Sequence, residues 1–268
     1  MAIAAVIKLG GDVLTAPAVN VVAAEIARAR AAGLRLIVVH GGGPQTTELS
    51  RRLGIEPRLV GGRRITDAAS LDVVKMVVAG RLNVDLVAAL RAAGVPAVGL
   101  SGSSGVVRAR RRPPRVVSGS GGEAIDFGLV GDVEGIERAL LDALEAGGHL
   151  PVIACLGADA AGTTLNINAD VVASQLAASV GAAALVACTA VGGVRRDKDD
   201  PATRMARLTV AEARAAIHDG IVQGGMIPKL EEAFAPLAGG VGAVHIVAPA
   251  EIAASLASPG SVGTLLVA

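Results

Sequence analysis

The chain has 268 residues, of which 52% are hydrophobic, 18% are charged and 1% are aromatic, and its net charge is +1 at pH 7. This composition excludes a disordered chain, and the length suffices for one large domain or two smaller lobes. The near-neutral charge and the lack of Trp and Tyr argue against nucleic acid as a partner, because neither a global field nor aromatic stacking would attract it.

Short β-branched runs alternate with Ala-rich helical stretches through the first hundred residues. Gly33 ends the first helical stretch, and Pro44 stands at a position that the first turn of a helix permits. The predicted elements are strand 2–9, helix 19–32, strand 34–39, helix 45–53, a long helical region 68–93 interrupted near Gly80, and strand 97–100. Buried strands flanked by helices predict an α/β fold, a three-layer α/β/α sandwich around a mostly parallel sheet.

The middle of the chain differs, because its apolar runs are short and a basic run interrupts them. Residues 106–109 and 115–117 flank Pro113-Pro114 and predict a β-hairpin. The Arg108–Arg115 run is interpreted first as a solvated hairpin and second as an anion-binding feature. The later predicted elements are an extended piece 127–133, helix 135–146, strand 150–155, helix 169–180, strand 184–188, helix 210–219, helix 225–237, strand 244–247, helix 249–256 and strand 263–267.

A domain boundary is plausible near residue 180. The prediction is an N-terminal lobe over residues 1–180 and a C-terminal lobe over residues 181–268, although one continuous sheet in a single domain would serve both. Cys155 and Cys188 show no metal-like spacing and make a poor disulfide framework. No leader peptide and no membrane-spanning run is visible, so a reducing cytoplasm is the expected location.

Glycines follow two consecutive predicted strands. Lys8-Leu9-Gly10-Gly11 ends the first strand, and His40-Gly41-Gly42-Gly43-Pro44 joins the second strand to a helix. Ligands of such sheets bind at the carboxyl edge, where bare backbone N–H groups and a helix N-terminus favour an anion. The alternative is a pair of Gly-rich turns without a ligand. The usual P-loop, protein-kinase and dinucleotide signatures do not occur, so a kinase of a different design has to be considered.

Further segments make the chain similar to a known family. They are Gly62-Arg63-Arg64-Ile65-Thr66, Gly99 to Gly102, Asp126 to Val133, Asn166-Ile167-Asn168-Ala169-Asp170, Gly224 to Lys229 and Gly263-Thr264. With the two glycine turns, they resemble the amino acid kinase family over nearly the full length, and within it the members that phosphorylate N-acetyl-L-glutamate. The resemblance implies a carbamate kinase-like fold, and ATP and N-acetyl-L-glutamate as the small-molecule substrates in arginine biosynthesis.

The resemblance also implies the roles of the acceptor-site residues. Gly42, Gly43, Arg64 and Asn166 would bind the substrate, with the guanidinium fork of Arg64 matched to its anchoring carboxylate. The reacting carboxylate is already ionised at pH 7, so no general base is needed. Catalysis would then consist of positioning and charge neutralisation. The family gives that work to two lysines held by an acid, which are Lys8, Lys229 and Asp170 here.

The nucleotide side matches the family less closely. The residues expected to contact phosphate or nucleotide are Gly10, Gly11, Thr189, Gly193, Gly224, Gly225 and Met226. Ala190 stands where members often carry an aspartate, so a polar contact to ATP is lost. Mg²⁺ would be held mainly through the ATP phosphates, and no protein residue is expected to bind a metal ion.

Two other functions stay open. One is a sister kinase that acts on a carrier-linked aminoadipate or glutamate in lysine synthesis, for which the Arg108–Arg115 run would be a docking surface. The other is a non-catalytic nucleotide-binding storage or regulatory protein. Arginine-inhibited members carry an extra N-terminal helix, which this sequence does not show. The expectation is therefore an arginine-insensitive homodimer with the 68–93 helical region at its interface.

Overall fold

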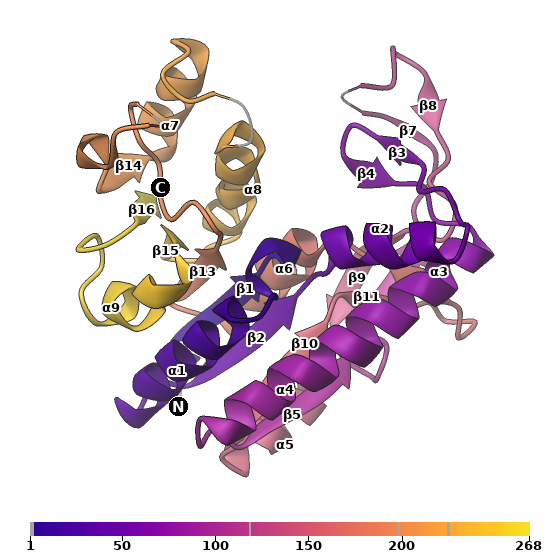
Figure 1. The fold of residues 1–268 in the computed structure, drawn as a ribbon, viewed down its shortest axis with the longest axis horizontal. Helices are drawn as coiled ribbons and strands as arrows, with labels where there is room; N and C mark the ends of the chain where they lie inside the picture. The colour runs from indigo at the N-terminus through magenta and orange to yellow at the C-terminus, as the bar shows by residue number, and fades with distance from the viewer. Residues whose placement is uncertain (1–2, 118, 198, 224–225) are drawn as a thin grey trace.

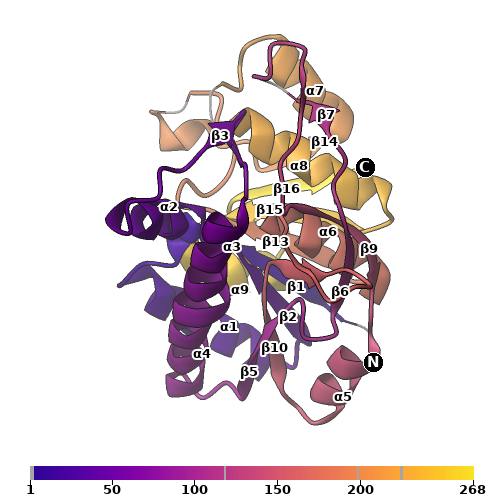
Figure 2. The same ribbon diagram turned by 90° about the vertical axis from the view of Figure 1, so that its right-hand side faces the viewer.

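The structure is a computed structural model that describes residues 3–117, 119–197, 199–223 and 226–268. A central eight-stranded sheet runs through the molecule, with helices on both faces (Figures 1 and 2). In order across the sheet, its strands are β14 (Arg207–Thr209), β16 (Thr264–Val267), β15 (Ala243–Val247), β13 (Ala184–Cys188), β1 (Ala5–Leu9), β2 (Leu36–His40), β10 (Leu150–Ala154) and β5 (Ala97–Ser101).

All neighbouring strands of this sheet are parallel except the pair β15–β16. The sequence prediction of an α/β sandwich around a mostly parallel sheet is therefore confirmed. Strand β1 lies between β2 and β13, with Leu9 opposite both His40 and Cys188. The residues that follow β1, β2 and β13 consequently meet at one edge of the sheet.

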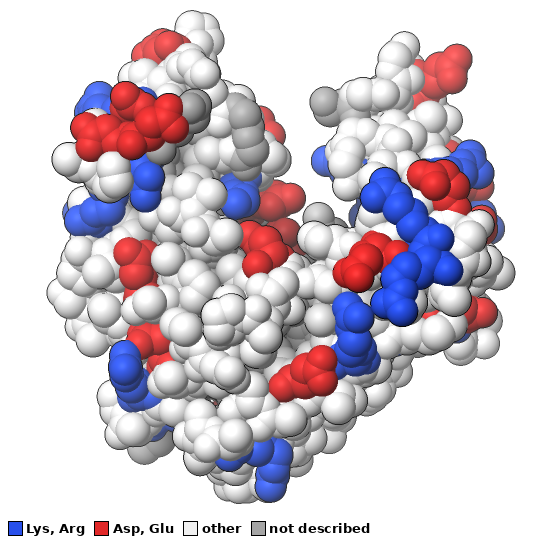
Figure 3. Space-filling model, in the orientation of Figure 1, with Lys and Arg blue, Asp and Glu red and all other residues white. Residues whose placement is uncertain are grey.

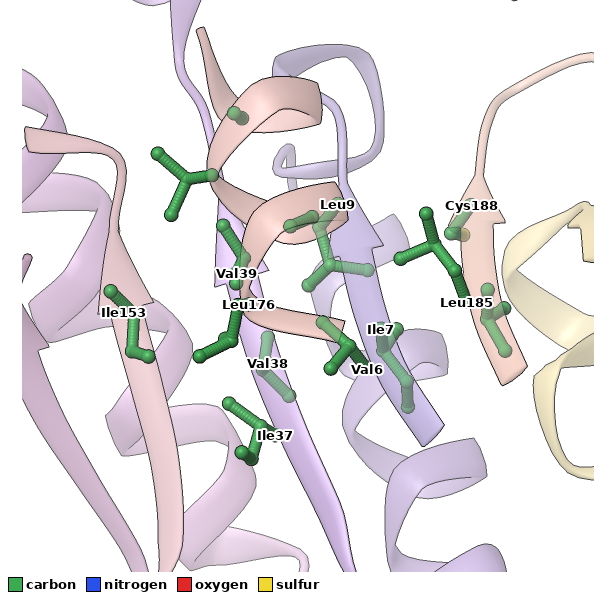
Figure 4. Close-up of a cluster of buried hydrophobic side chains, with 14 of the residues drawn as sticks. Val6, Ile7, Leu9, Ile37, Val38, Val39, Ile153, Leu176, Leu185 and Cys188 are labelled. Carbon is green, nitrogen blue, oxygen red and sulfur yellow. The ribbon is translucent and has the colours of Figure 1, made fainter. Parts of the chain in front are cut away.

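Helices α1 (Ala18–Ala31), α4 (Asn83–Ala92) and α9 (Ile252–Ala257) cover one face of the sheet, and α5 (Ala139–Ala146), α6 (Ala169–Val180) and α8 (Met226–Ala238) cover the other (Figures 1 and 2). The sheet core between these layers consists of aliphatic side chains, as the low aromatic content requires. Figure 4 shows Val6, Val38 and Leu176 in this core, where α6 packs on β1 and β2. No helix of the described residues is both long and apolar enough to cross a membrane.

The long helical region is continuous where the sequence predicted an interruption. α3 (Ala68–Val74) passes into a π-helical segment, Lys75–Leu82, and then into α4, so Gly80 marks a change of winding. α2 (Gly43–Arg52) packs against α3, and α7 (Val210–His218) packs against α8 and β14. Single 3₁₀ turns are Gly11–Val13, Pro201–Thr203 and Pro249–Glu251, the last of which replaces the first turn of the helix expected over 249–256.

The hairpin expected around Pro113-Pro114 is wrong. β6 (Val107–Arg111) pairs with β9 (Gly131–Ile136), and β7 (Arg115–Val116) pairs with β8 (Ala124–Ile125). The two prolines therefore connect β6 of one strand pair to β7 of the other. The helix expected from residue 135 begins only at Ala139, because β9 continues to Ile136. The remaining strands are β3 (Leu59–Val60), β4 (Arg63–Arg64), β11 (Leu156–Ala158) and β12 (Thr164–Asn166).

Candidate active site

A cleft opens between the two lobes at the carboxyl edge of the central sheet, and Figure 3 shows it as the hollow between them. Its cavity volume is about 750 Å³, which is within the range of small-molecule sites. Both glycine turns line it, together with charged residues from several elements. The predicted site residues on its wall are Lys8, Gly10, Gly11, Gly42, Gly43, Arg64, Asn166 and Asp170.

Lys8 and Asp170 form an ion pair on the floor of this cleft. Lys8 is near the end of β1, and Asp170 stands in the first turn of α6, where the Asn168 side chain caps the helix. Lys8 Nζ lies 2.7 Å from Asp170 Oδ1, and the two side chains are 14% and 23% exposed. Burial disfavours the charged ammonium, but Asp170, Glu232 and Asp12 outweigh it and raise the pKa of Lys8. Lys8 is therefore a fixed positive charge at neutral pH.

A buried histidine, His40, holds the turn that follows β2. His40 Nδ1 donates to the Gly41 carbonyl oxygen at 3.0 Å, and Asn83 Nδ2 donates to His40 Nε2 at 2.9 Å. Burial lowers the pKa of His40 to about 4, so the ring is neutral at pH 7. α2 begins at Gly43, with Pro44 in its first turn. The N-terminus of α2, where the helix dipole is positive, therefore lies at the cleft.

The turns after β1 and β2 are packed against each other. Gln45 Nε2 donates to the Gly11 carbonyl oxygen at 2.6 Å. A Cβ added at Gly11 would lie 2.7 Å from Gln45 Oε1 and 2.8 Å from Pro44 Cδ, whereas one added at Gly43 would meet no atom within 4 Å. Gly11 is therefore required for close packing, and Gly43 keeps open the space in front of the turn.

Part of the Arg64 guanidinium is left without a partner from the protein, which suits it to bind an anionic ligand. Its Nη2 donates to Thr47 Oγ1 at 2.6 Å and to the Gly43 carbonyl oxygen at 3.3 Å. Its Nη1 is buried and has no hydrogen-bond partner, and burial lowers the pKa of the guanidinium. Across the same cavity, Asn166 Nδ2 donates to Thr66 Oγ1 at 3.1 Å. A carboxylate ligand would satisfy the free Nη1 with a charge-assisted hydrogen bond.

Of the residues predicted to contact phosphate or nucleotide, Gly10 and Gly11 line this cavity, whereas the described residues of the C-terminal part, Thr189, Gly193 and Met226, are not on its wall. Thr189 is buried, its N–H donates to the Val247 carbonyl oxygen, and its hydroxyl accepts from Gly192. Gly193 has φ +95° and packs against Gly263. Gly224 and Gly225 lie outside the described residues. Met226 and Lys229 begin α8 as half-buried residues, and the roles of all six stay predictions.

Sequence reasoning missed several residues of the cleft. Arg112 and Arg115 line it, and Arg112 is only 7% exposed and bonds Asp132 at 2.8 Å, which corrects the interpretation of the whole run as solvated. Glu232 of α8 also lines it, three residues after Lys229. The proline pair beside Arg112 was the signal that this part of the run turns inward. Thr47 and Phe127 have no such signal, because only the tertiary packing brings them to the cavity.

Another contact joins the two lobes next to the cleft. Asp12, which follows the first glycine turn, accepts a hydrogen bond from the Ala190 N–H at 3.1 Å. An acid is thus present beside the position where the family pattern has an aspartate, although it comes from the other lobe. Among the described residues, no three His, Cys, Asp or Glu side chains gather in a way that could hold a metal ion.

Comparisons with known proteins agree with this geometry. The model of the amino acid kinase family matches residues 4–248. The chain is 55% identical to the acetylglutamate kinase of Sorangium cellulosum, covering 98% of this chain and 94% of that protein. It is 52% identical to the acetylglutamate kinase of Anaeromyxobacter dehalogenans strain 2CP-1, covering 98% of each. The solved structure of Giardia carbamate kinase superposes with a TM-score of 0.70 at 18% identity over 99% of each chain, which supports the fold alone.

Proposed function

The chain belongs to the amino acid kinase family, and we propose that it transfers the γ-phosphoryl group of ATP to the side-chain carboxylate of N-acetyl-L-glutamate. The product is an acyl phosphate, and the reaction belongs to arginine biosynthesis. The relatives named above carry this activity in their names over nearly the whole chain. They favour neither the carrier-linked kinase nor the storage protein.

The observation that carries the proposal is the pairing of an unpartnered guanidinium with a fixed ammonium in one cleft. Arg64 presents its free Nη1 to a carboxylate, and Lys8 holds a positive charge beside Asp170 on the same wall. N-acetyl-L-glutamate has two carboxylates, so one would bind Arg64 while the other lies near Lys8. The Asn166 side chain would bind the amide and α-carboxylate region.

The reaction then needs no general base. A glutamate side chain has a pKa of about 4.3 and is already ionised at pH 7, so the barrier lies in bringing two anions together. Lys8 would neutralise the acceptor and the phosphoryl oxygens, while Asp170 fixes the ammonium. Backbone N–H groups of Gly11 and Gly43 would bind the transferring group, and Lys229 would stabilise the leaving β-phosphate.

ATP is proposed to bind against the C-terminal lobe, at the turn of Thr189 and Gly193 and the start of α8. Mg²⁺ would enter with the ATP phosphates and supply charge neutralisation there. Among the described residues, no group of His, Cys, Asp or Glu side chains could hold the Mg²⁺ ion, so we assign no side chain as its ligand. The cytoplasm, where ATP is available, is the proposed compartment, and the buried free thiols of Cys155 and Cys188 fit its reducing conditions.

A homodimer is proposed across the long helix. Met76 and Val84 lie eight residues apart in this helix and are 53% and 63% exposed, although both are apolar. Residues at this spacing share a face of a helix, and burying that face against a second copy would remove apolar surface from water. Light scattering should give the dimer mass, and a monomer mass would refute the assignment.

The function is tested by trapping its product. Purified protein with ATP, Mg²⁺, N-acetyl-L-glutamate and hydroxylamine should give a hydroxamate, because hydroxylamine attacks acyl phosphates. Carrier-linked aminoadipate should give far less product than the free substrate. Release of ADP without hydroxamate would reject the assignment of the acceptor, and nucleotide binding without ADP release would support a non-catalytic role.

A further inference from the structure

The side chain of Gln45 connects the two glycine turns of the cleft, although it does not line the cavity and no step of the proposed reaction uses it. Gln45 stands in the first turn of α2, directly after Pro44, and is only 8% exposed. Its Nε2 donates to the Gly11 carbonyl oxygen at 2.6 Å and to the Leu14 carbonyl oxygen at 3.5 Å. One amide of the second turn therefore holds the backbone of the first.

The backbone by itself does not fix the distance between these turns. β1 and β2 are hydrogen-bonded as far as Gly41, whose N–H donates to the Leu9 carbonyl oxygen at 3.1 Å. Beyond that bond, no backbone hydrogen bond joins residues 10–14 to residues 42–46, all of which the structure describes. The hydrogen bonds of Gln45 take over at the point where the backbone pairing ends.

The stability of the fold does not explain an amide at this position. Gln45 Oε1 is buried without a hydrogen-bond partner, and an added Cβ at Gly11 would lie 2.7 Å from it. A buried oxygen of this kind costs stability, and an apolar side chain of the same shape would avoid that cost. The Gly11 carbonyl oxygen also accepts from the Leu14 N–H at 3.2 Å, so it would keep a partner without Gln45.

Each of the joined turns presents a backbone donor to the cleft. Gly11 is the first residue of a 3₁₀ turn and Gly43 the first residue of α2, so neither N–H has an acceptor within its own helix. The start of α2 also holds the acceptor end of the site, because the Gly43 carbonyl oxygen and the Thr47 hydroxyl accept from Arg64. Gln45 thus links the turn of Gly11 to the part of α2 that holds Arg64.

We propose that Gln45 is a positioning residue, which fixes the two turns so that the N–H groups of Gly11 and Gly43 face the same phosphoryl group. The inference rests on the proposed function, in which both N–H groups bind the transferring group. Gln45 acts through the turns and does not touch a substrate. Donors held in advance stabilise the transition state more than the bound substrates, so loss of the link should lower kcat and leave both KM values nearly unchanged.

Gln45→Met separates this role from a structural one. Methionine is also unbranched and of similar length, so the variant loses the hydrogen bonds to Gly11 and Leu14 while the space stays filled. It also loses the unpaired Oε1. The melting temperature should therefore stay within about 2 °C of the wild type, whereas kcat should fall about tenfold, the effect of one hydrogen bond.

Ser50→Ala is the matched control on the same helix. The Ser50 hydroxyl is likewise buried without a hydrogen-bond partner, but it does not line the cavity and does not bond either turn. Ser50→Ala and Gln45→Met thus each remove an unpaired buried oxygen from α2, and only Gln45→Met removes the link between the turns. The kcat of Ser50→Ala should equal that of the wild type.

Gln45→Glu should restore the link only when its carboxyl is protonated. The ionised carboxylate has no hydrogen to donate to the Gly11 carbonyl oxygen, whereas the protonated form has an O–H. Burial raises the pKa of a carboxyl, so its kcat relative to the wild type should rise as the pH falls from 8 to 6. The charged residues on the elements packed against α2 are Asp12, Asp72, Lys75 and Arg81, with Glu48 on α2 itself. All five are exposed and shared with the wild type, so the ratio cancels their titration.

The test measures ADP release by the full chain at pH 6, 7 and 8, with ATP and N-acetyl-L-glutamate each varied. Gln45→Met should keep its tenfold loss at every pH, and Gln45→Glu should equal it at pH 8 and approach the wild type at pH 6. Equal kcat values for Gln45→Met and the wild type would overturn the proposal, as would a Gln45→Glu ratio that does not change with pH.

Two further outcomes separate this inference from the proposed function. If the wild type releases ADP but forms no hydroxamate, the acceptor assignment is wrong, and the kcat ratios of ADP release still decide the role of Gln45. If the wild type releases no ADP, the proposed function and the role of Gln45 are refuted together.

Discussion

The two walls of the cleft differ in how far their side chains are held before a ligand binds. On the N-terminal wall, Asp170 holds Lys8, and Thr47 holds Arg64. On the C-terminal side, the Thr189 hydroxyl accepts from the Gly192 N–H of its own turn, Gly193 packs against Gly263, and Glu232 of α8 lines the cleft. Under the proposed function, the acceptor would meet a prepared site, whereas the nucleotide would have to complete its own half. Preorganisation of this kind is where most catalytic stabilisation arises.

The largest effect should come from the lysine of the prepared wall. Lys8→Ala removes the ammonium beside the reacting groups, and we expect kcat to fall about a thousandfold, the cost of losing a preorganised donor. Lys229→Ala should lower kcat with little change in the KM for N-acetyl-L-glutamate. An ADP-release assay measures both, with Lys75→Ala as control, because Lys75 is exposed and pairs with the exposed Asp72. If Lys8→Ala had the kcat of the wild type, the catalytic role assigned to the N-terminal wall would be wrong.

The anchoring guanidinium should separate acceptor from nucleotide. Arg64→Ala removes charge-assisted hydrogen bonds worth about 1.5–3 kcal/mol, so kcat/KM for N-acetyl-L-glutamate should fall roughly 10- to 150-fold. The KM for ATP should change little, because Arg64 is on the acceptor wall. Initial-rate kinetics with each substrate varied will test this, and Arg52→Ala, at an exposed arginine that is not among the residues lining the cavity, is the control. A larger effect on ATP than on the acceptor would contradict the assignment.

Two glycines of the prepared wall should respond in opposite ways. Gly11→Ala drives a Cβ into Gln45 and Pro44, and we expect a loss of up to about 3 kcal/mol in the free energy of unfolding. Gly43→Ala points into open space, so the free energy of unfolding should stay within about 0.5 kcal/mol of the wild type. Its KM for N-acetyl-L-glutamate should rise, because the methyl group occupies the substrate space. Denaturant unfolding will measure the free energy of unfolding of both variants, and kinetics on the same preparations will measure their KM for N-acetyl-L-glutamate.

The smallest effect concerns the histidine beneath the turn. The folded-state pKa of His40, about 4, lies below its unfolded value of about 6.5, so the unfolded state binds more protons between these values. Stability is therefore lost as the pH falls through this window, by about 2 kcal/mol at pH 5. His40→Gln should flatten the pH dependence of unfolding, and His218→Gln, which alters an exposed histidine, should not. Parallel pH curves for His40→Gln and the wild type would contradict a buried neutral ring.

Much of the fold was predictable because its signals are local. The strand over 184–188 and the helix over 169–180 agree with β13 and α6 residue for residue, since an apolar run and an amphipathic period are read from neighbouring positions. The strand pairs around Pro113-Pro114 were not predictable, because β6 pairs with β9, which lies about twenty residues further along the chain. Pairing partners at that separation leave no local mark.

The acceptor side of the site was also predictable, and its electrostatics were not. Lys8, Gly43, Arg64, Asn166 and Asp170 come from different elements and were all expected, and the structure brings them to one cavity. The inward turn of Arg112 and the position of Glu232 on the wall of the cleft were missed. Both residues belong to charge-rich stretches, which usually mark a solvated surface.

By itself the sequence determined the class of the fold, the two glycine turns and several of the chemical types that line the cleft. Backbone freedom and hydrophobic periodicity belong to short stretches of chain, so the residues alone express them. Only the tertiary structure decided which charges meet. The raised pKa of Lys8 and the free Nη1 of Arg64 depend on burial and on partners that other elements supply, and neither exists before the chain has folded.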